Sequence, residues 1–424
     1  MLTSRRMLSL LLAAAAVIAI LSGCYAAPVS ETTEQGGETS GAIVTDSKIP
    51  VTTYPVSEEN IRVFGNMAAS ASTGGFWQWD TFFRSYIQAY DPVTRTTYIP
   101  CYQSGCRHND LTCNACFGDV ESLVEYRENY YAMVYTDDET ASALVTRPLS
   151  GGPLQTLASW EPENENESCR CALRCVSFGK AYVIANRETY ALTEDGQLTT
   201  AAQESSLVSV DLQTGEISTI LENCDNYDLY GVWEDIAVLR VLEMAEDAPE
   251  FEDWLAQQPE GTAWDEYDQQ FVRYRFLTRN LQTGEESVLV DTSENFVMTV
   301  DPHRSWGQYA VYQVDSSLYV YDLEKQAAKK LFTYEQNWDY YNYMILDGHV
   351  IAVCGTEDIC RVRAINIADG TVTELTTLSG RGMAFSIEYE CNGYFVGLMD
   401  SDEVAQYYIS KEDFYRSNYD GAFR

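Results

Sequence analysis

The chain has 424 residues and a formal net charge of −37, from 64 acidic and 27 basic residues. This excess of carboxylates excludes binding to double-stranded nucleic acid, because that binding depends on Lys and Arg side chains that neutralise phosphates. An anionic membrane would repel the body of the protein as well. The length fits two or three ordinary domains or one large all-β body.

The first 23 residues are typical of an export signal. Arg5 and Arg6 precede an apolar run at 7–21, which is shorter than the roughly 20 residues that a membrane-spanning helix needs. The run ends in Leu-Ser-Gly-Cys, with the cysteine at Cys24. This ending resembles the lipobox of bacterial lipoproteins, which implies a diacylglyceryl thioether on Cys24. An ordinary secretory signal with an incidental cysteine is the alternative.

The segment that follows predicts a flexible linker. Residues 25–57 are rich in Ser, Thr, Glu, Gly and Pro and hold few aromatic side chains, so they cannot bury enough surface to become ordered. We therefore divide the chain into a lipoprotein signal peptide at 1–23, the lipidated cysteine and linker at 24–57, and one folded domain at 58–424. The expected location is the extracytoplasmic face of the cell membrane, with the lipid as the only membrane contact.

A repeated hairpin pattern begins near residue 60. Each copy has an alternating apolar strand, a polar turn and a second strand that ends on aliphatic residues, most clearly at 207–221, 276–290, 318–332 and 362–375. Gly215, Gly284 and Gly370 supply the positive φ that tight turns require, and the flanking β-branched residues suit a pleated surface. A further strand pair precedes each hairpin, so four strands recur about every 40 to 65 residues.

This pattern predicts an all-β fold, a single β-propeller with seven four-stranded blades; six or eight blades are the alternatives. The expected blades cover residues 60–101, 119–157, 173–221, 228–290, 295–333, 341–378 and 384–412. Ile61 to Phe64 could be the inner strand of the first blade or the outer strand of the last. The best candidate for a helix is 250–258, which directly follows a proline.

Two short motifs of this sequence are also found in a known group of proteins. Cys101, Cys106, His108 and Cys113 form a Cys-x4-Cys-x-His-x4-Cys segment, and Lys-Glu-Asp-Phe stands at 411–414. With the repeated hairpins, the chain resembles the low-density-lipoprotein-receptor-like β-propeller region of uncharacterised Firmicutes lipoproteins, which carry segments of both kinds. The blades lack the repeated Tyr-Trp-Thr-Asp motif of receptor propellers. The resemblance implies the fold and a surface location, and no established activity.

The cysteine-rich segment admits two chemical interpretations. Zinc favours four tetrahedral thiolate and imidazole ligands, which Cys101, Cys106, His108 and Cys113 provide, and Cys116 could replace one of them. A structural zinc is thus the one cofactor that we expect. Disulfides are the alternative in an exported protein. Four further cysteines also fall between expected blades: Cys169, Cys171, Cys175 and Cys224. With Cys101, Cys106, Cys113 and Cys116 they make eight thiols, which we expect to lie close together on one face.

Two other cysteines suggest a local disulfide. Cys354 and Cys360 flank a short turn, so we expect them to face each other across a hairpin. Cys391 is expected to pack as a small apolar residue.

No catalytic signature is present, so we assign no catalytic residue and expect no enzyme activity. The chain has three histidines, and no nucleophile elbow or other nucleophile turn supports a Ser-His-Asp triad. Carboxylates are so abundant that a catalytic pair cannot be identified from the sequence.

An acidic insertion at about 243–270 is the strongest candidate for partner binding. It combines many carboxylates with Phe251, Trp254, Trp264 and Tyr267, a mixture that suits a basic protein or a sugar face. The alternative, which we favour, is that these aromatic rings fold back onto the rim of the propeller.

The sequence therefore predicts a monomeric, non-enzymatic binding module for a protein, glycan or solute at the cell surface. One alternative is an extracellular propeller enzyme, a carbohydrate- or peptide-directed hydrolase or lyase that uses channel carboxylates. A second alternative is a structural or sensory component of an envelope complex.

Overall fold

The computed structural model describes residues 60–422 with gaps, the longest of which are 63–76, 259–266, 292–296, 300–307, 334–339, 380–384 and 400–405. The expected signal peptide, Cys24 and the linker lie outside the described residues. Within the described part of the chain, no helix is both long and apolar enough to cross a membrane.

Antiparallel strands make up most of the described structure. The first half of the chain forms two sheets, from β2 (Trp77–Thr81), β3 (Arg84–Asp91), β4 (Thr96–Tyr98), β5 (Cys116–Tyr126), β6 (Asn129–Tyr135), β7 (Ser142–Pro148) and β8 (Gln155–Trp160), and from β1 (Asn60–Arg62), β9 (Glu167–Ser177), β10 (Lys180–Leu192), β11 (Leu198–Asp211) and β12 (Ile217–Glu222).

Four further sheets follow in chain order. They consist of β13 (Tyr227–Trp233), β14 (Ile236–Met244), β15 (Val272–Asn280) and β16 (Glu286–Asp291); β17 (Val297–Thr299), β18 (Tyr309–Val314), β19 (Ser317–Asp322) and β20 (Ala327–Thr333); β21 (Tyr340–Leu346), β22 (His349–Gly355), β23 (Ile359–Asn366) and β24 (Val372–Ser379); and β25 (Phe385–Cys391), β26 (Tyr394–Met399) and β27 (Gln406–Ser410). The two described helices of the chain are short, α2 (Phe251–Leu255) and α4 (Lys411–Tyr415).

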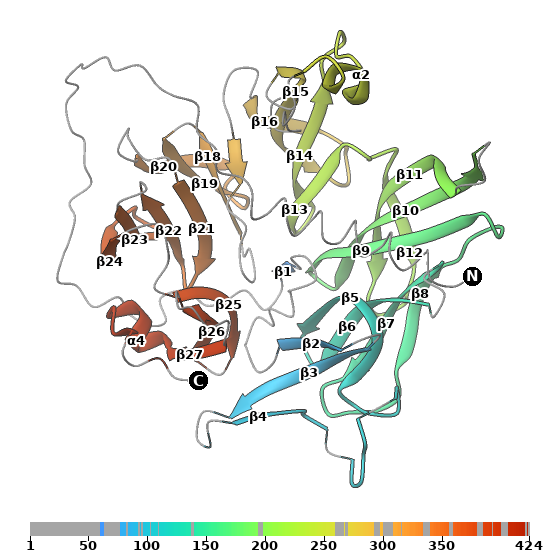
Figure 1. The fold of residues 1–424 in the computed structure, drawn as a ribbon, viewed down its shortest axis with the longest axis horizontal. Coiled ribbons are helices and arrows are strands. Elements are labelled where there is room, and N and C mark those ends of the chain that lie inside the picture. Colours follow the sequence, from blue (N-terminus) through green and yellow to red (C-terminus); the bar gives the residue numbers. More distant parts are fainter. Residues whose placement is uncertain are drawn as a thin grey trace.

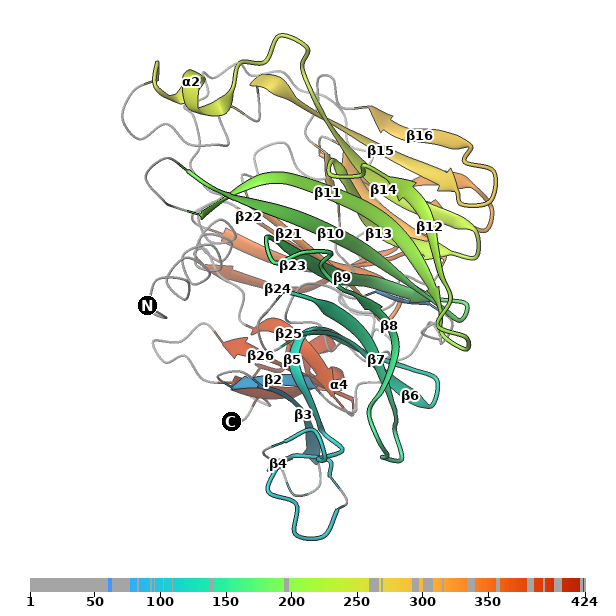
Figure 2. The same cartoon turned by 90° about the vertical axis from the view of Figure 1, so that its right-hand side faces the viewer.

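The sheets follow one another around a common centre, each with its strands in sequential antiparallel order (Figure 1). The view turned by 90° shows that they are stacked side by side as separate layers (Figure 2). This radial arrangement of short meandering sheets is a β-propeller, and the protein is all-β as the hairpin repeat predicts.

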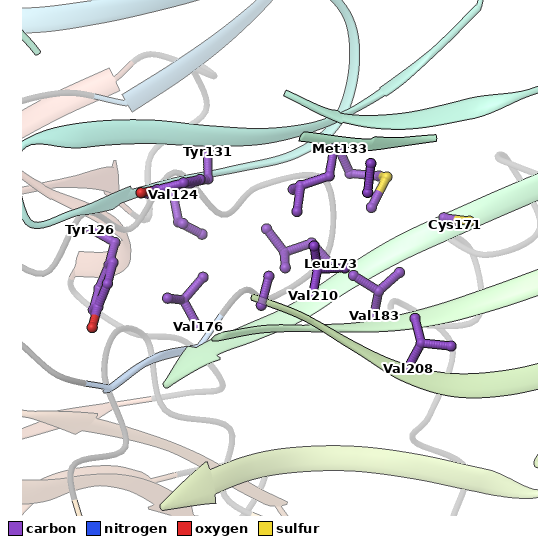
Figure 3. Close-up of a cluster of buried hydrophobic side chains, with 13 residues drawn as sticks. Val124, Tyr126, Tyr131, Met133, Cys171, Leu173, Val176, Val183, Val208 and Val210 are labelled. Carbon is purple, nitrogen blue, oxygen red and sulfur yellow. The ribbon is translucent and has the colours of Figure 1, made fainter. Parts of the chain in front are cut away.

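Hydrophobic clusters between consecutive sheets hold the layers together. Figure 3 shows the cluster that joins β5–β7 to β9–β11, where Leu173, Val183 and Val210 meet Met133. Comparable clusters join β9–β12 to β13–β15, β14–β15 to β18–β19, and β18–β20 to β21–β24. Each side chain of this kind stabilises the fold by about 1.5 to 3 kcal/mol when fully buried.

The strand groups agree with the expected blades within a few residues, except near the amino end. There, β3 pairs with β5, so β2–β8 form one continuous sheet path. Of the segment 61–64, residues 61 and 62 are described, and for them both of our options are wrong, because β1 pairs with β9, with Ile61 opposite Val176. The expected helix is shorter than 250–258, and the number of blades stays a prediction.

The carboxyl end is fastened to the preceding sheet. Ser410 caps α4 by accepting a hydrogen bond from the Asp413 amide at 3.0 Å. In the first turn, Lys411 Nζ lies 2.6 Å from Asp347 Oδ1, and both side chains are buried. Tyr415 donates its hydroxyl to Asp347 Oδ2 at 2.7 Å. The Lys-Glu-Asp-Phe motif therefore joins α4 to the turn between β21 and β22.

His349 begins β22 beside this contact and gives a pH prediction. It is buried, and its Nδ1 lies 2.8 Å from the Asp347 carbonyl oxygen, so Nδ1 carries the donated proton. Burial lowers the pKa of His349, while Asp347 and Asp369 oppose this in part. The unfolded chain therefore binds a proton more readily. The contribution of neutral His349 to the free energy of unfolding is fully present above about pH 6.5. It falls by up to about 1.4 kcal/mol per pH unit as the pH drops below that value.

Urea unfolding at pH 7.5 and pH 5.5 measures this effect, and the His349→Gln variant should lose most of the difference. An unchanged pH dependence in His349→Gln would contradict the assignment. Carboxylates with lowered pKa values, such as Asp211, lose their stabilising effect only near or below pH 3.8, outside this window.

Candidate metal centre

The loop between β4 and β5 brings the four expected ligands together. The donor atoms of Cys101, Cys106, His108 and Cys113 all lie within 4.8 Å of one another. His108 Nδ1 is 3.2 Å from Cys113 Sγ. Ligands around a tetrahedral zinc with Zn–S bonds of about 2.3 Å are separated by about 3.8 Å, so this set matches the size and chemistry of such a site. The cluster could hold a metal ion.

Local turns within the loop explain why these thiols converge. Gly105 has φ of 74° and His108 has φ of 53°, so both reverse the chain direction in the left-handed region. The Cys106 amide donates to the Gln103 carbonyl at 3.2 Å, and the Cys113 amide donates to the Asp110 carbonyl at 3.0 Å. Each turn places its cysteine directly after the bend.

Arg147 on β7 fastens this loop to the propeller, although nothing in the sequence singles it out. Its fully buried guanidinium donates to the carbonyl oxygens of Cys113, Cys116 and Leu111, the last at 2.8 Å. The same group lies 5.0 Å from the centre of the Phe117 ring. Hydrogen bonds from a charged donor are among the stronger ones, so Arg147 fixes the carboxyl half of the loop.

The thiols differ in their acidity. Burial, together with the neighbouring Cys101 and Cys106, raises the pKa of Cys113 to about 12. Burial also disfavours ionisation of Cys101, but hydrogen bonds from the backbone of Gln103 and Asn114 outweigh it and lower the pKa of Cys101. A cation would replace the protons shared in this cluster, because zinc binds thiolates.

The other cysteines do not join this group, which corrects the expectation of one crowded face. Cys169, Cys171 and Cys175 lie within strand β9, and Cys224 lies in the turn after β12. Cys171 packs in the core between β5–β7 and β9–β11, while Cys175 and Cys224 pack in the next core around the ring. No disulfide joins any of the eight described cysteines from Cys101 to Cys224. Cys116 is fully buried at the start of β5 and is not part of the ligand set.

The expected pair of Cys354 and Cys360 is not directly opposed in the ladder. The register of β22 and β23 places Cys360 opposite Gly355 and Cys354 opposite Arg361. Successive residues of a strand alternate between faces, so this register is offset by one residue from the one that a cross-strand pair needs. The side chains of both cysteines, and of Cys391, lie outside the described residues. The disulfide stays a prediction that the register does not favour.

The aromatic residues of the acidic insertion pack against one another. Trp254 and Tyr267 are buried, with ring centres 5.2 Å apart, and Phe251 stacks on Trp254 at 6.1 Å. The Tyr267 hydroxyl donates to the Pro249 carbonyl at 2.5 Å. Trp254 and Tyr267 therefore do not offer exposed faces to a partner. Whether the rings fold back onto the rim of the propeller stays a prediction. Trp264 lies outside the described residues.

Comparisons with known proteins identify no family. No family model matches the sequence, and no curated protein matches it. Similar solved structures include the β-propeller domain of the trilobed protease from Pyrococcus furiosus, at 11% identity and a TM-score of 0.46 over 82% of this chain and 95% of that chain. An oligogalacturonate lyase in complex with manganese gives 13% identity and a TM-score of 0.39 over 80% and 84%. An uncharacterized protein from Listeria monocytogenes EGD-e has 9% identity and a TM-score of 0.42 over 89% of this chain and 96% of that chain.

Proposed function

We propose that this protein is a lipid-anchored extracytoplasmic propeller that acts as a non-enzymatic binding module, with a structural zinc in the loop between β4 and β5. The observation that carries the proposal is the convergence of Cys101, Cys106, His108 and Cys113 within 4.8 Å. Four protein ligands fill a tetrahedral shell and leave no open position for a substrate, which is typical of structural rather than catalytic zinc.

Such a metal would fix the shape of a surface loop. Leu111 lies between His108 and Cys113 in this loop and is 52% exposed, although it is apolar. Its carbonyl is held by Arg147 from the propeller side. A metal bound by the residues on either side would hold Leu111 in one position, and a preorganised contact residue binds a partner with less loss of conformational entropy.

Elemental analysis of the purified full chain tests the metal. We expect about one equivalent of zinc in the wild type and in Cys224→Ser, which changes a buried cysteine outside the cluster, and little in Cys101→Ser. A zinc content below about 0.2 equivalents in the wild type, together with disulfides at Cys101, Cys106 or Cys113, would exclude the site.

Membrane fractionation tests the anchor. The wild-type chain should remain with the membrane, because two acyl chains hold a protein far more firmly than one. The Cys24→Ser variant should lose the lipid and the membrane association. Equal retention of both chains would exclude lipidation at Cys24.

One observation favours testing the enzyme alternative. Glu121 is the extra residue of a β-bulge in β5, between the pairs Val120–Val134 and Ser122–Met133. Burial raises its pKa against the opposing effects of nearby polar groups and Arg174, and its Oε2 has no hydrogen-bond partner among the described atoms. Bulges often aim side chains at active sites. Among the described carboxylates, no second one with a raised pKa accompanies it.

We expect Glu121→Gln to raise the free energy of unfolding at neutral pH by about 1 kcal/mol or more. A carboxyl whose pKa is raised by folding contributes stability below its unfolded value of 4.5, and that contribution is lost as the pH rises through the folded value. Urea unfolding at pH 7.5 measures the change, with the exposed Glu128→Gln as control. A destabilised Glu121→Gln would contradict this account. Screens for glycan or peptide cleavage should use the same variant as the inactive reference.

A further inference from the structure

One strand of the propeller has a long edge without a neighbour. Strand β11 runs from Leu198 to Asp211, but β12 pairs with it only from Ser206 to Val210. On the other side, β10 follows β11 along its whole length. Residues 198–204 are all exposed, and no described strand covers their outer edge. The hairpin of β10 and β11 extends beyond the neighbouring strands in both views (Figures 1 and 2).

The backbone groups at this edge are oriented for pairing. The Ser205 carbonyl accepts a hydrogen bond from the Cys224 amide at 2.9 Å, so the polar groups of Ser205 point to the outer edge. Groups two residues apart in a strand point the same way, which places the amide and carbonyl of Gln203 at the open edge. Exposed edges usually carry Lys or Pro as protection against pairing, and residues 198–205 contain neither.

A cleft of about 420 Å³ lies beside the point where β12 ends. The register puts its polar residues on one face of the sheet, since Glu204 is opposite Arg187 and Glu222 is opposite Ser206. Trp160, from β8 of the preceding sheet, forms the facing wall. A strand added along residues 198–204 would continue the line of β12 and place alternate side chains at this cleft.

The charge of the cleft favours a basic occupant. Arg187 already forms ion pairs with Glu167 at 3.1 Å and with Glu163 at 3.2 Å, so its charge is balanced by those two carboxylates. Glu204 and Glu222 therefore give the lining of the cleft a net negative charge. A Lys or Arg side chain could lie between these carboxylates and the Trp160 ring. A second copy of this chain fits less well, because each copy carries a net charge of −37.

We propose that the open edge of β11 binds an extended segment of another protein by strand addition, with a Lys or Arg of that segment in the cleft lined by Trp160, Glu204 and Glu222. Main-chain hydrogen bonds along residues 198–204 would supply affinity, and the cleft would supply specificity. Leu192 and Leu198, opposite each other and 71% and 45% exposed, would extend the contact toward the tip. The inference rests on the proposed binding role, but it needs neither the zinc nor the lipid.

Selection from a displayed library of random octapeptides on the purified full chain tests the proposal. We expect enrichment of proline-free sequences with a Lys or Arg at a fixed position. For a synthetic enriched peptide, Gln203→Pro should weaken binding at least tenfold, because it removes the outward amide. The Glu204→Gln, Glu222→Gln double variant should weaken binding about tenfold, and so should replacing the basic peptide residue by glutamate.

The matched control is Glu188→Gln. Glu188 pairs with Gln203, so it lies on the opposite face from Glu204, and its loss should leave the affinity unchanged. The proposal is overturned if no peptide is enriched, if enriched peptides bind Gln203→Pro as tightly as wild type, or if sedimentation shows that a second copy covers the edge. Retained zinc and membrane attachment in such an outcome would leave the proposed metal and anchor intact.

Discussion

Substitution of Cys113 by serine is expected to release the metal and to lower the free energy of unfolding by about 3 kcal/mol or more. Among the four candidate ligands, Cys113 is the one that is fully buried, and it packs with Ala115 and Phe117 in the core between β5 and its neighbours. Loss of this thiolate leaves three ligands and places a hydroxyl among apolar side chains. Urea unfolding with and without a chelator, together with the zinc content, measures both effects.

Adding a chelator distinguishes the contribution of the metal to stability from the contribution of core packing. It should destabilise the wild type and leave Cys113→Ser unchanged, because that variant has no metal to lose. Cys116→Ser is the matched control, since Cys116 is also fully buried but lies outside the ligand set. It should lose stability through packing and yet keep its zinc and its response to the chelator. A wild type that is indifferent to the chelator would contradict a structural metal.

The parts of the fold that depend on local sequence could be predicted. The turn at 211–215 follows from Asp211, whose carboxylate accepts the amides of Gln213 and Thr214, and from Gly215 with φ of 75°. These contacts span a few residues, so residue type and spacing determine them. The convergence of the four candidate ligands was predictable for the same reason, because all four lie within one short loop.

Contacts between distant segments were not predictable in the same way. The pairing of β1 with β9 joins Ile61 to Val176, and no local pattern specifies which strand a short segment will choose. Arg147 carries no motif, yet it is fully buried because three carbonyl oxygens from another loop accept hydrogen bonds from its two terminal nitrogens. One signal was available for the cysteines of β9: Cys169, Cys171 and Leu173 alternate as the buried face of a strand does.

Lys411→Met is expected to destabilise the protein by about 3 to 5 kcal/mol, because it removes one partner of a buried ion pair. The Lys411 and Asp347 side chains are 8% and 7% exposed, and their charged atoms lie 2.6 Å apart. The Lys411 ammonium is also 5.4 Å from the centre of the Phe395 ring. Without it, the Asp347 carboxylate keeps the Tyr415 hydroxyl but loses its buried cation. Urea unfolding at pH 7.5 measures the loss.

A second substitution shows whether the charge itself is responsible. Asp347 has φ of 49°, a conformation that Asn also adopts readily, so Asp347→Asn keeps the turn and can still accept from Tyr415. The double variant Lys411→Met, Asp347→Asn should therefore recover most of the stability that Lys411→Met loses, because no uncompensated charge remains buried. Strictly additive losses in this cycle would instead mean that α4 is held by the packing of Phe414 and Tyr415, and that the ion pair contributes no coupling energy.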